Sequence, residues 1–201
     1  AEFEAGPRIP NSVHVDMDDI AAKGHLNPKN LPHMLPPKEL FAAAMDSFGI
    51  SNDDHVVVYG RDGCIFTPRT FFLFRSMGHD PSRVHLMQGS FEEWAERGGD
   101  VETGPVMVLR SEDLDPDGSP PRYRARDAAN VCDMDYVLRV VETAAAKDGE
   151  DEDDNDDAAP VLLDPRGTTF HKGHIPGAIN IPYLSVLEDG DRLKFMPRDE
   201  L

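Results

Sequence analysis

A short pattern that occurs twice, once near each end of the chain, constrains the fold more than any other feature. It consists of an aromatic residue, two intervening residues, Gly, a basic residue, Ile-Pro, two small residues and an apolar, polar, apolar run. The copies occupy 3–15, with Pro7 as one inserted residue, and 170–181. Because Gly accepts positive φ and Pro prevents a helix from continuing, each copy predicts a turn that leads into a short strand.

The separation of the two copies indicates what kind of repeat they form. Pro10 and Pro176 lie much further apart than the roughly 20 to 50 residues of a solenoid unit. Their separation suits duplicated domains of about 100 to 150 residues with a linker. A chance recurrence of two Ile-Pro turns is the alternative.

The middle of the first half predicts a parallel sheet with helices packed on it. Residues 55–59 form a β-branched run typical of a strand buried on both faces, and 83–87 form the next strand. Thr67 as N-cap and Pro68 after it indicate a helix between the two strands, and Ser90 caps a further helix. This order predicts an α/β fold with a doubly wound parallel sheet and right-handed crossovers.

Weaker signals suggest the remaining elements. Asp16 caps a short helix, Pro37 opens a longer one, and Asp133 caps a helix in the second half. Further strands are expected at 13–15 and 106–109, with an edge strand at 123–128 and a buried strand at 161–164.

Charge and cysteine content exclude several classes of protein. The 201 residues include 38 acidic and 20 basic ones, for a net charge of −18. This balance argues against a nucleic-acid partner and against an anionic membrane surface. No apolar run approaches the ~20 residues that cross a bilayer. Two cysteines form no disulfide framework, so the expected setting is reducing and intracellular, either cytoplasmic or mitochondrial.

The acidic residues are concentrated in one segment, which helps to divide the chain. Eight of them lie within 148–157, so 147–159 is interpreted as a disordered acidic insertion. The predicted first domain with its linker covers 1–121. The N-terminal half of a second domain is predicted to cover 122–201.

The loop at 60–66 is where chemistry is expected, because ligands bind at the carboxyl ends of parallel strands. Its backbone N–H groups and the helix that follows could stabilise an anion or a thiolate. Cys64 lies in this loop, but a nucleophile held by such a cradle should come directly after the strand, where Gly60 stands. Cys64 is therefore interpreted as a thiol without a catalytic role, and Cys132 as structural.

Two other clusters of residues have possible functions. His171 and His174 have a spacing that can bind a metal, but no further ligands accompany them, so a structural turn is favoured and no metal is assigned. Three arginines alternate along one face of an expected strand and could bind phosphate; ion pairing or solvation is favoured for them. These are Arg122, Arg124 and Arg126.

At these residues the sequence resembles the rhodanese family, in particular its two-domain members that act on thiosulfate or 3-mercaptopyruvate. In the second half the resemblance is carried by 163–166, Phe170 and 173–182. In the first half it is carried by the diverged copy of the repeat and by four segments. These are 55–59, 63–69, 77–79 and 89–94.

The resemblance implies a sulfurtransferase. A cysteine thiolate takes the sulfane sulfur of a small anionic donor as a persulfide and passes it to cyanide or to a thiol, such as that of thioredoxin or a sulfur-carrier protein. No cofactor is implied. Arg166 matches the family's Asp-x-Arg motif and is the candidate substrate-binding residue, with an ion pair or strand cap as its alternative role. Gly60 agrees with a first domain that lacks the nucleophile.

The resemblance also implies that the chain is a fragment. The catalytic cysteine is expected beyond Leu201, and the first domain is expected to lack its opening strand. The chain as given is therefore expected to be inactive, and none of its residues is assigned as catalytic. One alternative function is a rhodanese-like module for binding or regulation. The other is a relative of phosphatases and arsenate reductases built on the same cradle.

Overall fold

The computed structural model describes residues 2–106, 122–147, 160–188 and 194–200. The chain divides into two compact units between Ala128 and Ala129. Residues 122–128, assigned above to the second half, thus belong to unit 1. The predicted domain limits themselves stay a prediction, because a compact unit and a repeated unit need not share a boundary. The acidic insertion, apart from Lys147, and most of the expected strand 106–109 lie outside the described residues.

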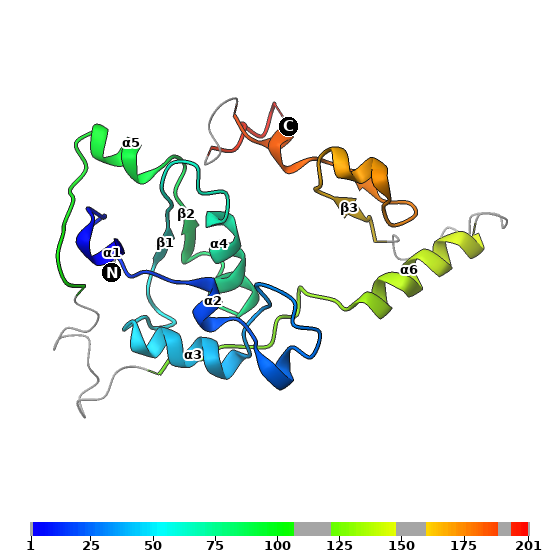
Figure 1. Cartoon of the computed structure of the whole chain (residues 1–201), viewed down its shortest axis with the longest axis horizontal. Helices are drawn as coiled ribbons and strands as arrows, with labels where there is room; N and C mark the ends of the chain where they lie inside the picture. Colours follow the sequence, from blue (N-terminus) through cyan, green and yellow to red (C-terminus); the bar gives the residue numbers. More distant parts are fainter. Residues whose placement is uncertain (1, 107–121, 148–159, 189–193, 201) are drawn as a thin grey trace. The chain divides into compact units, whose positions relative to one another are not determined.

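Unit 1 has the predicted order of strand, helix, strand and helix at its centre. Strands β1 (Val56–Val58) and β2 (Val84–Leu86) pair in parallel, and helix α4 (Thr67–Ser76) connects and contacts them (Figure 1). Helix α5 (Phe91–Glu96) follows β2. The other elements of unit 1 are α1 (Glu2–Ala5), α2 (Met17–Ile20), η1 (Gly24–Leu26) and α3 (Lys38–Ser47). The α/β fold with parallel strands is confirmed.

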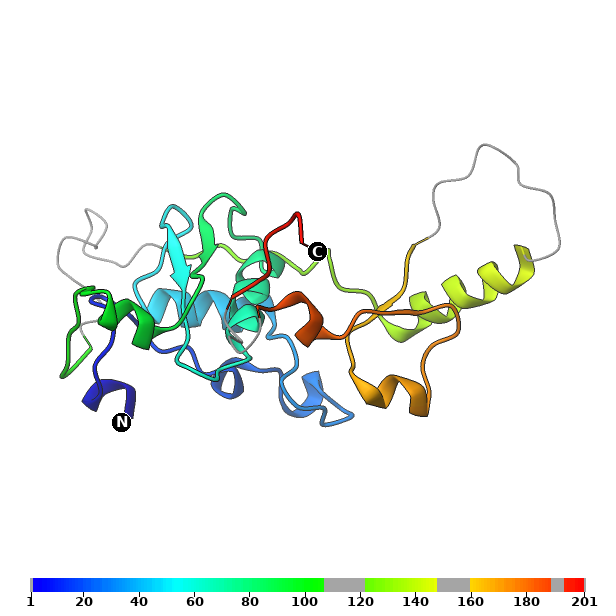
Figure 2. The same cartoon turned by 90° about the horizontal axis from the view of Figure 1, so that it is seen from above.

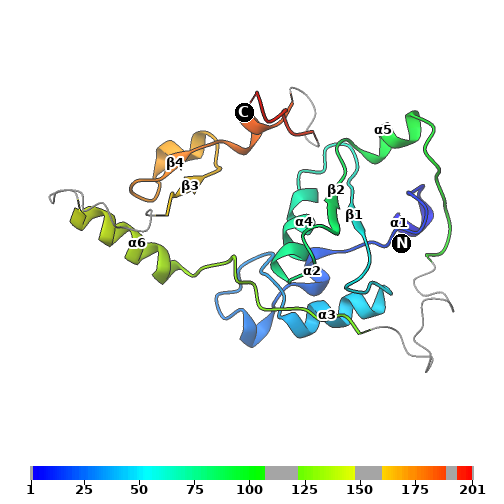
Figure 3. The same ribbon diagram turned by 180° about the vertical axis from the view of Figure 1, so that it is seen from behind.

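The core of unit 1 lies where α3 and α4 pack beside the two strands (Figure 2). Apolar residues one turn apart on each helix supply most of it, because that spacing places them on one face. The segment 122–128 runs along α3 and adds a buried tyrosine (Figure 3). The core residues are Ile20, Phe41, Met45, Leu73, Phe74, Met77, Val84 and Tyr123.

In unit 1, two predicted helix caps are confirmed and one is wrong. The Asp16 carboxylate accepts a hydrogen bond from the N–H of Asp18, and the Ser90 hydroxyl accepts one from the N–H of Glu93. Thr67 is not the N-cap of α4, which begins one residue earlier than predicted. The Thr67 hydroxyl donates to the Cys64 carbonyl at 3.4 Å, so this side chain anchors the preceding loop to the helix.

Two expected strands of unit 1 are not strands. Residues 123–128 do not form an edge strand, because side chains satisfy their backbone: Tyr123 N–H donates to Asp46 Oδ1 and Arg124 N–H donates to Asn52 Oδ1. Residues 13–15 are extended, but none of the described residues pairs with them as a strand.

Strand β1 is not buried on both faces, contrary to prediction. Helix α4 covers one face of the β1–β2 pair, where Val58 is buried. Val57 on the opposite face is 55% exposed. The apolar run therefore predicts the strand correctly. It does not predict that one face of β1 is exposed, because burial depends on what packs against each face.

Unit 2 contains a helix and a second parallel strand pair. Helix α6 (Met134–Lys147) begins after Asp133, whose Oδ1 accepts from the N–H of Tyr136, as predicted. Strands β3 (Leu163–Asp164) and β4 (Ile179–Asn180) are joined through η3 (Thr168–Lys172), and η4 (Tyr183–Val186) follows. β3 confirms the strand expected at 161–164 but not its burial, since Leu163 is 59% exposed.

None of the helices within the described ranges is long and apolar enough to cross a membrane.

Candidate functional site

The repeated pattern folds into the same turn in both units. In unit 1 the Ser12 N–H donates to the Ile9 carbonyl at 3.3 Å, and Asn11 has φ 63°. In unit 2 the Ala178 N–H donates to the Ile175 carbonyl at 3.0 Å, and the corresponding Gly177 has φ 79°. Pro followed by a residue with positive φ is the sequence of a type II turn. The turn predicted from the repeat is therefore confirmed in both copies.

The aromatic and basic residues of the repeat also contact each other in both copies. The Arg8 guanidinium lies 5.5 Å from the centroid of the Phe3 ring. The His174 ring stacks on Phe170 with 3.9 Å between centroids, and its Nδ1 lies 3.2 Å from the Phe170 carbonyl. His174 therefore packs within the turn. No group of three residues that could hold a metal occurs in the part of the chain that the structure describes.

Arg166 forms a clamp at the end of β3. Its Nε donates to Asp164 Oδ1 at 2.9 Å, and its Nη2 donates to Asp164 Oδ2 at 2.6 Å. The same Nη2 donates to the Gly173 carbonyl at 2.8 Å, so one guanidinium ties the strand to the turn of the repeat. Asn180 on β4 completes the link, because its Nδ2 donates to the carbonyls of Asp164 and Arg166.

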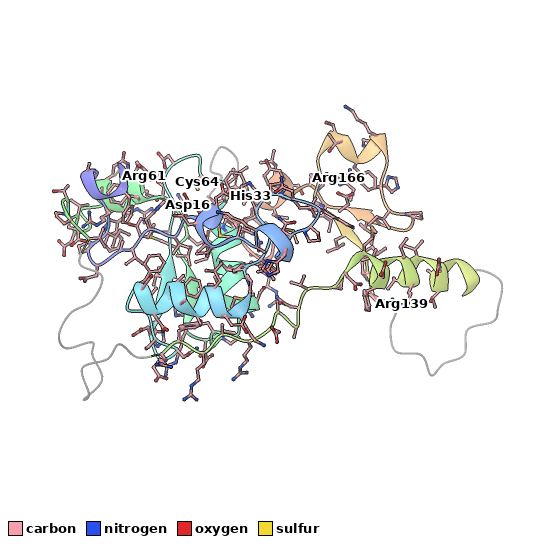
Figure 4. The ribbon with its side chains drawn as sticks, turned by 60° about the horizontal axis from the view of Figure 1, so that its bottom comes forward. Asp16, His33, Arg61, Cys64, Arg139 and Arg166 are labelled. Atoms are coloured by element: carbon pink, nitrogen blue, oxygen red, sulfur yellow. The ribbon has the colours of Figure 1, made fainter. Side chains whose placement is uncertain are left out.

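The clamp fixes the charges of both partners. Hydrogen bonds from the side chain and the backbone N–H of Arg166 lower the pKa of Asp164 to about 2. The Asp164 carboxylate in turn raises the pKa of Arg166. The side chain of Arg166 is 47% exposed, and its Nη1 donates to no acceptor among the described residues (Figure 4). The ion pair is observed, and donor binding by Arg166 stays a prediction.

In unit 1 the loop 60–66 is closed by a carboxylate of the chain itself. The Asp62 N–H, one of the donors expected to cradle an anion, donates to Glu92 Oε2 at 2.9 Å. The Arg61 guanidinium donates to Glu92 Oε1 at 3.0 Å and lies over the Phe91 ring. The Cys64 N–H donates to the Arg61 carbonyl. These donors of the loop are therefore already engaged, and Figure 4 shows Arg61 and Cys64 together in it.

The position where the family resemblance would place a nucleophile is sterically filled. A Cβ on Gly60 would lie 2.1 Å from Thr67 Oγ1 and 3.4 Å from Cys64 Cβ. Thr67 is buried. Gly60 is thus required by packing, and unit 1 cannot hold a side chain at this point without rearrangement.

Neither of the two cysteines lies at the nucleophile position that Gly60 occupies. Cys64 is half-buried in the loop, and Cys132 is exposed in unit 2 just before α6. Glu92 is the functional feature that sequence reasoning missed. Its position after the Ser90 cap predicts a place in the first turn of α5, but the sequence contains no signal that this turn faces the loop.

The comparisons with known proteins agree with this fold. Residues 1–97 match the family described as Rhodanese-like domain. The chain is 31% identical over 198 residues to the probable 3-mercaptopyruvate sulfurtransferase of Schizosaccharomyces pombe, covering 91% of this chain and 57% of that protein. It is 32% identical over 187 residues to the thiosulfate sulfurtransferase of Bos taurus, covering 90% of this chain and 57% of that protein.

A solved structure extends the likeness to the fold. The 3-mercaptopyruvate sulfotransferase SseA of Escherichia coli matches with a TM-score of 0.71 at 24% identity, over 96% of this chain and 65% of that one. The fold is that of the rhodanese class, and residues 1–97 form a rhodanese-like domain. The chain is similar to the 3-mercaptopyruvate and thiosulfate sulfurtransferases, of whose length it spans a little over half.

Proposed function

We propose that the protein carrying this chain is a sulfurtransferase that moves a sulfane sulfur from 3-mercaptopyruvate or thiosulfate to cyanide or a thiol. The observation that carries the proposal is the identity of 31% to a 3-mercaptopyruvate sulfurtransferase over 91% of the chain, through both units. The Ile-Pro turn that the repeat forms in each unit, called the corner below, also supports the proposal. This repeat is part of the resemblance to sulfurtransferases.

The proposed reaction has two steps. A cysteine thiolate attacks the terminal sulfur of thiosulfate, whose S–S bond breaks to release sulfite, or the thiol sulfur of 3-mercaptopyruvate, whose C–S bond breaks to release the enolate of pyruvate, which takes up the proton of the mercapto group. In both cases the cysteine becomes a persulfide. Cyanide or a thiolate then attacks the outer sulfur and regenerates the thiolate. Neither Cys64 nor Cys132 is the persulfide-forming residue in this proposal, because Gly60 stands at the nucleophile position and Glu92 engages donors of the loop.

The chain's own residues have supporting roles in the proposal. The clamp of Arg166 on Asp164 holds the end of β3 against the turn of the repeat, and Nη1 of Arg166 offers a donor to an anionic substrate. Unit 1 acts as a non-catalytic partner domain. The acceptor is a small thiol or a protein such as thioredoxin. The reaction takes place inside the cell, in the cytoplasm or in a mitochondrion, as the name of an Arabidopsis thaliana relative suggests.

Thiocyanate formation tests the proposal. The protein carrying this chain is incubated with cyanide and either thiosulfate or 3-mercaptopyruvate, as wild type and with Cys64→Ser or Cys132→Ser. We expect turnover with at least one donor and no loss in either variant. Absence of turnover with both donors, together with hydrolysis of p-nitrophenyl phosphate, would favour phosphatase chemistry instead. Loss of turnover in Cys64→Ser would refute the assignment of that thiol.

A second variant tests the clamp. Arg166→Lys keeps the charge but cannot form the two-pronged contact with Asp164. If Arg166 contacts the donor, KM rises while kcat changes little. Gly167→Ala serves as the control in the same turn, because a Cβ at Gly167 has no neighbour within 4 Å. If KM is unchanged in Arg166→Lys, Arg166 has a structural role and does not bind the donor.

A further inference from the structure

Three arginines of unit 1 line one open hollow of about 630 Å³, although they come from distant segments. Arg75 lies in the last turn of α4, and Arg124 and Arg126 lie in the extended segment after residue 121. The floor of the hollow is formed by the turn that includes Gly78 and His79.

The hollow lies at the opposite end of the strands from the loop 60–66. Asn52, which lines it, precedes β1, and Asp80, which also lines it, precedes β2. The loop with Gly60 follows the carboxyl end of β1. Because β1 and β2 are parallel, the hollow is at their amino ends, away from the loop 60–66.

A buried hydrogen-bond network holds the segment that carries two of the arginines. The Tyr123 hydroxyl and His79 Nδ1 are 2.8 Å apart, and His79 Nε2 lies 3.0 Å from the Asp54 carbonyl. Since a carbonyl only accepts, Nε2 donates to it and Nδ1 accepts from Tyr123. His79 is 1% exposed and Tyr123 is 4% exposed. The segment is therefore anchored in the core at the residue that precedes Arg124.

The backbone of Arg124 and Arg126 is fixed as well. Asn52 exchanges two hydrogen bonds with the backbone of Arg124, at 2.7 and 3.2 Å. The Arg126 N–H donates to the Met77 carbonyl at 2.8 Å. The Cβ, Cγ and Cδ atoms of Arg126 lie 3.0 Å from the position that a Cβ on Gly78 would take, so the Arg126 stem lies directly over this glycine.

The guanidinium groups themselves have no carboxylate partner within the described ranges. Arg8, Arg61, Arg97 and Arg166 each pair with a carboxylate at 3.1 Å or less. Arg75 contacts only the Phe71 ring, at 5.5 Å, and no ion pair joins Arg124 or Arg126 to a described residue. Asp80, the carboxylate at the hollow, accepts from the N–H and hydroxyl of Ser82 and lies 3.9 Å from Arg83.

Three unpaired cations at one hollow are unexpected in a chain with almost twice as many acidic as basic residues. Carboxylates are abundant, yet none of those described forms an ion pair with these three guanidinium groups. A guanidinium presents a planar fork of donors that matches the oxygens of a phosphate group, and several forks suit an anion of more than one charge.

We infer that the hollow lined by Arg75, Arg124 and Arg126 is a binding site for a multivalent phosphate anion. The core network around His79 and Tyr123 holds the backbone that carries Arg124 and Arg126 before the ligand arrives, which limits the entropy lost on binding. This inference does not rest on the sulfurtransferase proposal, because it is argued from residues of unit 1 alone.

Isothermal titration calorimetry with inorganic pyrophosphate tests this site. The titration uses low salt, with sodium chloride at matched ionic strength as the reference. We expect Arg75→Gln and Arg124→Gln each to weaken binding by about ten-fold, since each change removes a charge-assisted hydrogen-bond donor to the anion. Arg126→Lys keeps the stem on Gly78 and the charge but removes the fork, and we expect it to weaken binding without lowering thermal stability.

Arg122→Gln is the matched control, because Arg122 lies in the same segment and is exposed but does not line the hollow. We expect its affinity to change by less than about two-fold. An equal loss in Arg122→Gln and Arg124→Gln would show general charge attraction and overturn the site. Pyrophosphate binding no stronger than chloride binding would also overturn the site. NMR shifts at the Gly78 amide on adding pyrophosphate would support it, and shifts confined to other regions would overturn it.

Discussion

Substituting Gly60 tests whether packing alone excludes a side chain from the nucleophile position. A Cβ there would lie 2.1 Å from Thr67 Oγ1, well inside the contact distance of the two atoms. Thr67 is buried and lies in the first turn of α4, where rotation about χ1 would replace Oγ1 by a methyl group in a crowded site. Overpacking of this kind costs about 1 to 3 kcal/mol, so we expect Gly60→Ala to lower the free energy of unfolding by that amount.

A double-mutant cycle in urea identifies the cause. Thr67→Ala removes Oγ1 and leaves Cβ atoms at 3.3 and 3.4 Å, which are tolerable contacts. We expect Gly60→Ala and Thr67→Ala together to cost less than the sum of the single changes, by about 1 kcal/mol. Gly63→Ala is the control, since its cost comes from φ 77° and no atom lies within 4 Å. Additive costs at Gly60 and Thr67, or a loss below about 0.5 kcal/mol in Gly60→Ala, would refute the reasoning.

Three further predictions concern the network, the clamp and the corner. Tyr123→Phe leaves the buried Nδ1 of His79 without its donor, so urea unfolding should show a loss of about 1 to 3 kcal/mol in unit 1. The pKa of Asp164 is lowered to about 2 by Arg166, from about 3.9 when unfolded. The clamp therefore stabilises fully above pH ~4 and is lost as the pH falls through about 2, and Asp164→Asn should remove this acid dependence. An NMR titration of the Asp164 carboxyl carbon measures this pKa, and a midpoint near ~3.9 would contradict the prediction. Gly177→Ala should cost about 1 kcal/mol because φ is 79°, and Gly177→Asn should cost less, as thermal unfolding can show.

The sequence allowed the parallel strand pairs and the corners to be predicted, because local chemistry decides them. Pro10 and Pro176 with the positive-φ residues after them specify one turn whatever surrounds them. The β-branched run at β1 and the Ser90 cap are equally local signals. Burial was predicted less well, because it depends on what packs against each face. Val57 and Leu163 are exposed although their strands are apolar.

The site could be predicted only where its partners are close in sequence. Asp164 and Arg166 are two residues apart, and their pairing was one of two roles expected of the arginine. Glu92 reaches a loop thirty residues earlier, and no periodicity reports such a contact. The strand predicted in the segment 122–128 is wrong for a related reason. The alternation of residues there is typical of an edge strand. In the structure, the side chains of Asp46 and Asn52 accept the backbone N–H hydrogen bonds that a neighbouring strand would otherwise accept.

The two corners share one backbone path while carrying Asn11 in one unit and Gly177 in the other. The same tight turn therefore forms with either residue after the proline. Two side chains at one position, within a single polypeptide, mark how much variation this turn accepts while φ stays positive.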